Sequence, residues 1–83
     1  MLYKVRIAVF DDGKFIKDEQ DMINRRPLVE IDEYRRGQYF EYVSRSDSEE
    51  VINVEAYRLI ETEFNRQNLP FEIISIEEIV RKE

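Results

Sequence analysis

The sequence predicts an α+β fold in which a mostly antiparallel sheet packs on one long helix, with the element order β-β-β-β-α-β. Three observations carry this prediction. Apolar and polar residues alternate over much of the first 45 residues, apolar residues recur at helical spacing from Ile52 to Phe64, and a β-like run follows Pro70. The length of 83 residues suits a single domain over residues 1–83.

The first strand is expected at Tyr3–Val9, where apolar residues alternate with Lys4, Arg6 and Ala8. Asp12-Gly13 then favours a tight hairpin turn, because Gly adopts positive φ without steric cost. The second strand is expected at Lys14–Glu19. The cross-strand pairs expected around this turn are Val9 with Ile16, Phe10 with Phe15, and Arg6 with Glu19.

A second hairpin is expected after an irregular segment at residues 21–27. Leu28–Tyr34 indicates a third strand, Arg35–Gln38 a turn, and Tyr39–Arg45 a fourth strand. The apolar pattern sets Tyr34 opposite Tyr39 and Ile31 opposite Tyr42. One sheet face is then apolar and the other polar, as in an antiparallel sheet with one solvated face.

The helix is expected to begin near two overlapping capping boxes, in which side-chain oxygens accept the free N–H groups of the first turn. Asn68 is expected to cap the other end, and Pro70 prevents continuation. The residues of the boxes are Ser46 with Glu49 and Asp47 with Glu50, and the apolar stripe is Ile52, Ala56, Leu59, Ile60 and Phe64.

The last strand is expected at Phe71–Ile76, returned to the sheet by the helix. It is expected either parallel to the fourth strand or on another edge of the sheet. Residues 77–83 are expected to form a short turn or a fraying, charged end.

Composition restricts the chemistry of the chain. It holds no cysteine and no histidine, so disulfides, thiolate metal sites and imidazole-based catalysis are excluded. The acidic residues near the first turn lack EF-hand spacing, and no phosphate-binding loop or nucleophile motif is present. We therefore expect no enzyme activity, no metal and no cofactor. The acidic residues in question are Asp11, Asp12, Asp18, Glu19 and Asp21.

The net charge of −6 lies entirely in the second part of the chain. Residues 1–45 hold nine basic and nine acidic residues, whereas residues 46–83 hold four basic and ten acidic residues. An ordered array of carboxylates could imitate a phosphate backbone. An acidic inhibitor of a nucleic-acid-binding protein is therefore one alternative function.

Arginine and tyrosine concentrate at the predicted second hairpin turn, in Tyr34, Arg35, Arg36 and Tyr39. These residue types commonly anchor protein contacts, so the leading hypothesis is a small non-enzymatic interaction module that binds another protein. Guanidinium groups also bind phosphates and aromatic rings stack on bases. Binding of RNA or single-stranded nucleic acid, with Arg25 and Arg26 joining the turn, is therefore a second alternative.

Self-association is also expected, since one helix covers only one face of the sheet. Phe10 and Phe15 are predicted to lie on the opposite face, where an exposed apolar patch or a sheet edge would pair two copies or a partner. No segment has the length or apolar character of a membrane span, so we expect no membrane association and a cytoplasmic location.

Overall fold

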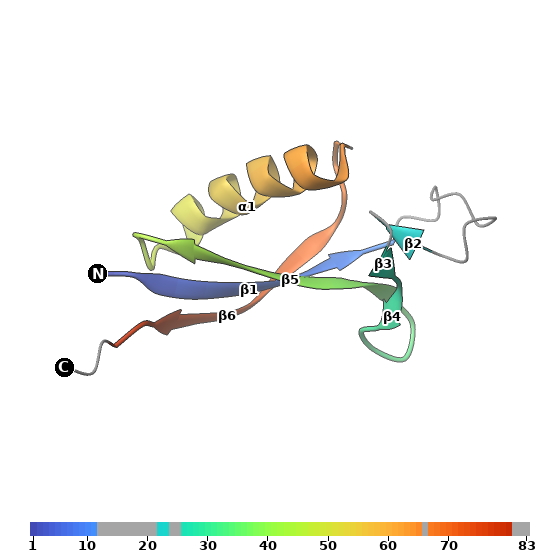
Figure 1. Cartoon of the computed structure of the whole chain (residues 1–83), viewed down its shortest axis with the longest axis horizontal. Coiled ribbons are helices and arrows are strands. Elements are labelled where there is room, and N and C mark those ends of the chain that lie inside the picture. The colour runs from blue at the N-terminus through green and yellow to red at the C-terminus, as the bar shows by residue number, and fades with distance from the viewer. Residues whose placement is uncertain (12–21, 24–25, 66, 81–83) are drawn as a thin grey trace.

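The computed structural model describes residues 1–11, 22–23, 26–65 and 67–80. A four-stranded antiparallel sheet has the order β4-β5-β1-β6, and one helix, α1, packs across one of its faces (Figure 1). This confirms the predicted α+β class. A two-stranded unit, β2-β3, lies at one end of the sheet. The elements are β1 Tyr3–Phe10, β2 Met22–Ile23, β3 Arg26–Pro27, β4 Val29–Glu30, β5 Arg36–Ser44, α1 Glu49–Phe64 and β6 Phe71–Glu78.

Strand β1 is central, because β5 pairs with one of its edges and β6 with the other. Val9 lies opposite Gln38 on one side and Phe71 on the other. The predicted pairing of Val9, Phe10 and Arg6 with a strand at residues 14–19 is therefore wrong, since both edges of β1 are occupied. The predicted turn and second strand themselves, including Phe15, lie outside the described residues.

The second hairpin has a different register from the predicted one. Val29 lies opposite Gly37, and Glu30 opposite Arg36, so the strand expected at Leu28–Tyr34 ends after two residues. The cause is Asp32. Its Oδ1 accepts the N–H of Tyr34 at 2.9 Å and the N–H of Arg35 at 2.8 Å, which turns the chain before Arg36.

Gly37 lies within β5 and not in the turn. A Cβ built on Gly37 would stand 1.9 Å from the backbone oxygen of Val9. The glycine therefore permits a close approach of two backbones in neighbouring strands, which is a recognised role of glycine inside a sheet.

Helix α1 begins later than the capping boxes predict. Ser48 is the N-cap and makes no side-chain capping bond, while its N–H donates to Ser46 Oγ at 3.1 Å. Ser46 therefore shapes the turn before the helix, and the two predicted capping boxes are wrong. The helix ends at Asn65, which adopts the left-handed conformation with φ 52°, and not at Asn68.

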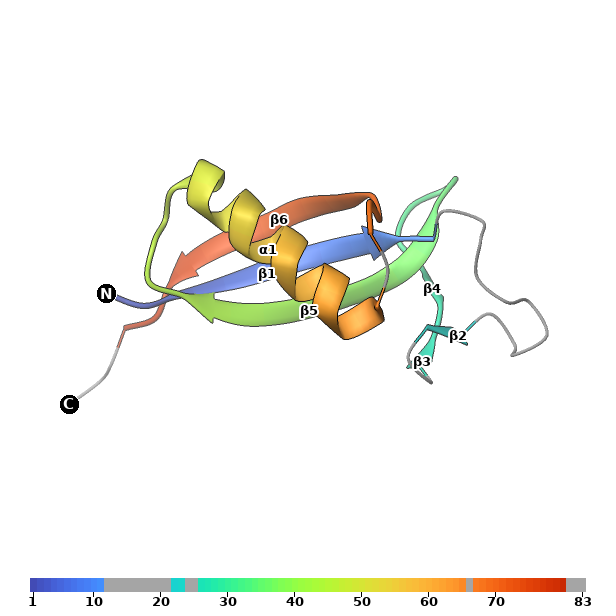
Figure 2. The same ribbon diagram turned by 90° about the horizontal axis from the view of Figure 1, so that it is seen from above.

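The apolar side of α1 packs on the central strand. Four helix residues are buried against the alternate residues of β1 that face the helix. Figure 2 views this packing from the helix side. The members of this core are Val5, Ile7, Val9, Ile52, Ala56, Ile60, Phe64 and Leu69.

Strand β6 occupies the edge beyond β1. Because β5 and β6 are both antiparallel to β1, they point in the same direction, and α1 is the crossover that returns the chain. The strand continues to Glu78, so the prediction that Glu77 begins a turn or a frayed end is wrong for the first two residues of that segment. Its pairing with β1 is interrupted by a bulge opposite Arg6 and Ile7.

Substitution of Gly37 by Ala should lower the free energy of unfolding by about 1–3 kcal/mol, because the new Cβ forces β5 away from β1. Chemical denaturation measures this change. Glu30→Ala, at the neighbouring paired position, is the control and should stay within about 0.5 kcal/mol of wild type. Equal stability of Gly37→Ala and wild type would contradict the close approach.

Candidate functional site

The first candidate, the Arg/Tyr turn, does not form one cluster. Tyr34 is 90% exposed at the tip of the turn. Arg35 points instead to the sheet, where its guanidinium lies 3.9 Å from the centre of the Phe10 ring. Tyr39 lies farther along β5, and the guanidinium of Arg6 stacks over its ring at 4.5 Å.

Arg35 is held by two carboxylates. One of its terminal nitrogens lies 2.7 Å from Asp32 Oδ2, and the other donates to Glu72 Oε1 at 3.0 Å. The hydrogen bond from Arg35, followed by that from the N–H of Tyr34, holds the pKa of Asp32 below its ordinary value. Arg35 thus joins the β4–β5 turn to β6, and its charge is already compensated.

Of the remaining predicted site residues, the structure describes Arg36, Arg26 and Phe10. Arg36 is exposed at the start of β5, and Arg26 lies in β3. Arg25 and Phe15 lie outside the described residues. Phe10 is only 3% exposed, with Arg35 stacked on its ring, so the expectation of an exposed apolar surface at Phe10 is wrong.

The outer edge of β5 was not singled out by the sequence, and β4 covers only the beginning of it. Strand β4 pairs with β5 only at Arg36 and Gly37. Within the part of the chain that the structure describes, no strand pairs with β5 from Tyr39 to Val43 on the side away from β1. We call this stretch, residues 39–43, the open edge.

The direction of the backbone groups along the open edge follows from one hydrogen bond. The N–H of Asp11 donates to the carbonyl of Arg36, so Arg36 and every second residue after it direct their backbone groups to β1. Tyr39, Glu41 and Val43 therefore direct their N–H and C=O groups outward. No strand of the described residues pairs with these groups, so a further strand could add there.

The opposite edge, on β6, has two features that hinder strand addition. The bulge within β6 breaks the regular spacing of its outward backbone groups. Three carboxylates, at Glu72, Glu77 and Glu78, also line this strand. Bulges and charged side chains hinder the pairing of edge strands. The β6 edge is therefore less suited to accept a further strand than the open edge of β5.

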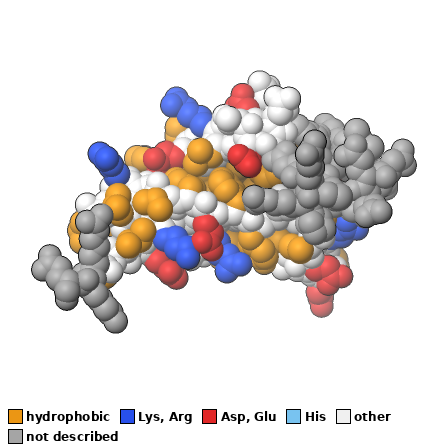
Figure 3. Space-filling model, in the orientation of Figure 1, with side chains coloured by type: hydrophobic (Ala, Val, Ile, Leu, Met, Phe, Trp, Pro, Cys, Tyr) orange, Lys and Arg blue, Asp and Glu red, His pale blue; other side chains and the backbone are white. Residues whose placement is uncertain are grey.

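A hollow of about 560 Å³ lies along the open edge where α1 faces β5. Its apolar surface comes from Phe40 and Tyr42, whose rings stack with centroids 6.2 Å apart, and from Leu59 of the helix, which is 39% exposed. Figure 3 shows hydrophobic side chains gathered on this face, with charged groups beneath them. The lining residues are Arg6, Tyr39, Phe40, Glu41, Tyr42, Leu59 and Glu63.

Charges beside the open edge compensate one another. Glu41 Oε2 lies 3.0 Å from Lys4 Nζ, and Glu41 Oε1 lies 3.9 Å from Arg6 Nε. Glu41 is the only charged residue of the open edge itself. The edge is therefore locally close to neutral although the chain as a whole is acidic.

Tyr42 is fixed at the floor of the hollow. Its hydroxyl donates to the carbonyl of Ile52 at 3.3 Å, which joins β5 to α1. Burial, and secondarily the nearby Glu55 carboxylate, raise the pKa of Tyr42 to about 12. The phenol therefore remains a neutral hydrogen-bond donor at all physiological pH values.

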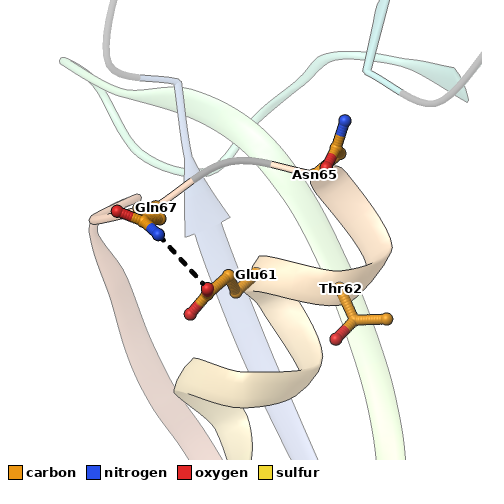
Figure 4. Close-up of a pocket in the computed structure, with 4 residues that line it drawn as sticks. All are labelled: Glu61, Thr62, Asn65 and Gln67. Carbon is orange, nitrogen blue, oxygen red and sulfur yellow. Dashed lines mark hydrogen bonds between the residues drawn. The ribbon is translucent and has the colours of Figure 1, made fainter.

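A second hollow, of about 480 Å³, lies at the C-terminal end of α1 (Figure 4). Its lining residues are all polar: Glu61, Thr62, Asn65 and Gln67. Gln67 Nε2 donates to Glu61 Oε1 at 3.5 Å, and the Thr62 hydroxyl donates to the Arg58 carbonyl. Among the residues that the structure describes, neither this hollow nor any other place gathers three side chains suited to a metal ion.

The described helix is neither long nor apolar enough to cross a membrane. Compared with protein-family models, curated proteins and solved structures, the chain shows no significant match.

Arg35→Ala should lower the thermal unfolding midpoint and speed amide exchange at Tyr34, because the variant loses both carboxylate contacts and the cover over Phe10. Arg45→Ala, at another exposed arginine, is the matched control and should leave both readouts unchanged. Indistinguishable unfolding midpoints for the two variants would mean that the contacts of the Arg35 side chain contribute nothing to stability.

Alkaline pH should test the environment of Tyr42. Its folded-state pKa of about 12 lies above the ordinary value of 10.0, so the stabilisation it gives is complete below pH 10 and is lost as the pH rises toward 12. Tyr42→Phe should flatten the fall in unfolding free energy over that interval. Tyr34→Phe, at the exposed turn, should keep the wild-type profile, and an unchanged profile in Tyr42→Phe would refute the assignment.

Proposed function

We propose that this protein is a non-enzymatic interaction module that binds another protein by accepting an extended segment beside β5. The observation that carries the proposal is the open edge, with outward backbone groups at Tyr39, Glu41 and Val43 beside an aromatic hollow. In strand addition, the backbone groups of an edge supply affinity and neighbouring pockets for alternate side chains supply specificity. The outward backbone groups and the aromatic hollow lie side by side along β5.

The hollow suits the side chains of an added strand. Alternate residues of that strand would point to the helix side and pack on Phe40, Tyr42 and Leu59. The intervening residues would lie on the outer face beside Tyr39 and Val43, which are 37% and 56% exposed. An extended segment with apolar residues on both sides at these positions therefore fits the edge.

The charge distribution favours a protein partner over nucleic acid. Arg35 is held by Asp32 and Glu72, and Lys4 and Arg6 both lie against Glu41. Nucleic-acid affinity depends mainly on uncompensated cations that neutralise phosphates, and the chain carries a net charge of −6. The compensated arginines are better explained as parts of the fold.

Val43→Pro tests the proposal, because it removes one outward N–H without removing a bond to β1. Peptides selected from a random library on the wild-type protein should lose affinity by about tenfold or more for this variant. Glu78→Pro, at an outward position of β6, is the matched control and should bind as wild type does.

Amide shifts in NMR spectra should place the selected peptides at Tyr39–Val43. Peptides that bind Val43→Pro as tightly as wild type, or that shift only β6 amides, would contradict strand addition at β5.

A further inference from the structure

We infer that the open edge pairs with the open edge of a second copy of this chain, so that the two sheets join into one. The inference rests on the proposed function, since it names the segment that lies beside β5. The two β5 strands pair antiparallel about a two-fold axis that passes beside Glu41. This arrangement follows from where the open edge begins and ends.

The ends of the edge fix the register. Strand β4 occupies the outer side of β5 at Arg36 and Gly37, and β5 ends at Ser44. A two-fold ladder centred nearer to β4 would set the partner's β4 against the last residues of β5. A ladder centred on Glu41 uses the whole open edge and avoids β4 in both copies.

The backbone groups match in this register. Tyr39 lies opposite the partner's Val43, and Glu41 lies opposite the partner's Glu41. These residues direct their N–H and C=O groups outward in both copies, so each opposed pair forms hydrogen bonds in both directions. The ladder therefore needs no rearrangement of β5.

The side chains match on both faces of the joined sheet. On the outer face, the ring of Tyr39 meets the partner's Val43, which is an aromatic and β-branched pair of the kind that stabilises neighbouring strands. On the helix side, Phe40 meets the partner's Tyr42 at the closer spacing of a non-hydrogen-bonded pair. These rings extend the stacked pair of Phe40 and Tyr42 across the axis and cover part of the hollow below Leu59.

The one unfavourable contact is Glu41 opposite its own copy. Each carboxylate already has Lys4 at 3.0 Å and Arg6 at 3.9 Å in its own chain. The two acidic groups face each other at the axis, but each is already compensated by cations of its own chain, which weakens their repulsion. The overall charge of −6 on each copy opposes association at long range, so added salt should strengthen the dimer.

Cysteine substitution tests the register, because the chain contains no cysteine of its own. In Glu41→Cys, the two thiols would stand on Cα atoms about 5.5 Å apart, within the span of a disulfide. In Val43→Cys, the two positions are displaced along the strands by about 14 Å and cannot be bridged. In a glutathione redox buffer, we expect about tenfold more cross-linked dimer for Glu41→Cys than for Val43→Cys.

Equal cross-linking of the two variants, or more for Val43→Cys, would overturn the assigned pairing. So would the absence of cross-linked dimer for both. Both variants keep every backbone N–H of β5, so this comparison does not depend on the folding of a proline variant.

Analytical ultracentrifugation separates this inference from the proposed function. Wild type and Glu78→Pro should sediment as dimers at high concentration, and Val43→Pro as a monomer. A wild-type monomer that still binds library peptides at Tyr39–Val43 would refute self-pairing and leave strand addition standing. If Val43→Pro folds but alters neither sedimentation nor peptide binding, both proposals fail.

Discussion

Every other part of the structure depends on the position of β1 between two antiparallel neighbours. Val5, Ile7 and Val9 have no exposed surface, because β5 and β6 flank them and α1 lies over them. The opposite side of the same strand carries Lys4 and Arg6, which remain in solvent and pair with Glu41. One alternating strand thus defines the core face, the polar face and the two edges.

The two edges of the sheet differ in regularity and in charge. β6 is delivered by a helical crossover and is bulged and acidic, which are features that discourage a further strand. β5 is regular from Tyr39 to Val43, and the one charged residue of that stretch, Glu41, is compensated within the chain. The functional proposal rests on this difference, since a regular and nearly neutral edge beside an aromatic hollow carries a risk of aggregation unless it has a partner.

The strongest periodic patterns of the sequence predicted the class, the helix and the first and last strands, because burial on a core decides those elements. Local signals were less reliable. Asp12-Gly13 favours a hairpin, yet β1 pairs with two distant strands that complete the core. Ser46 resembles a helix cap, yet its hydroxyl accepts the N–H of Ser48 before the helix begins. The proposed binding edge could not be predicted, since it depends on which distant strands pair with β5 and not on the local sequence of β5.

One residue accounts for the short pairing of β4 with β5. If the β4–β5 ladder continued in its observed register, Pro27 would lie opposite Tyr39, a residue whose carbonyl points outward and needs an N–H donor. Proline has no N–H to give. The chain instead sets Pro27 opposite Met22 in the separate β2–β3 unit, at the end of the sheet (Figure 2). Pro27 thus keeps β4 from beginning before Val29, and the Asp32 turn ends it after Glu30, so that no strand of the described residues continues along the outer side of Tyr39–Val43.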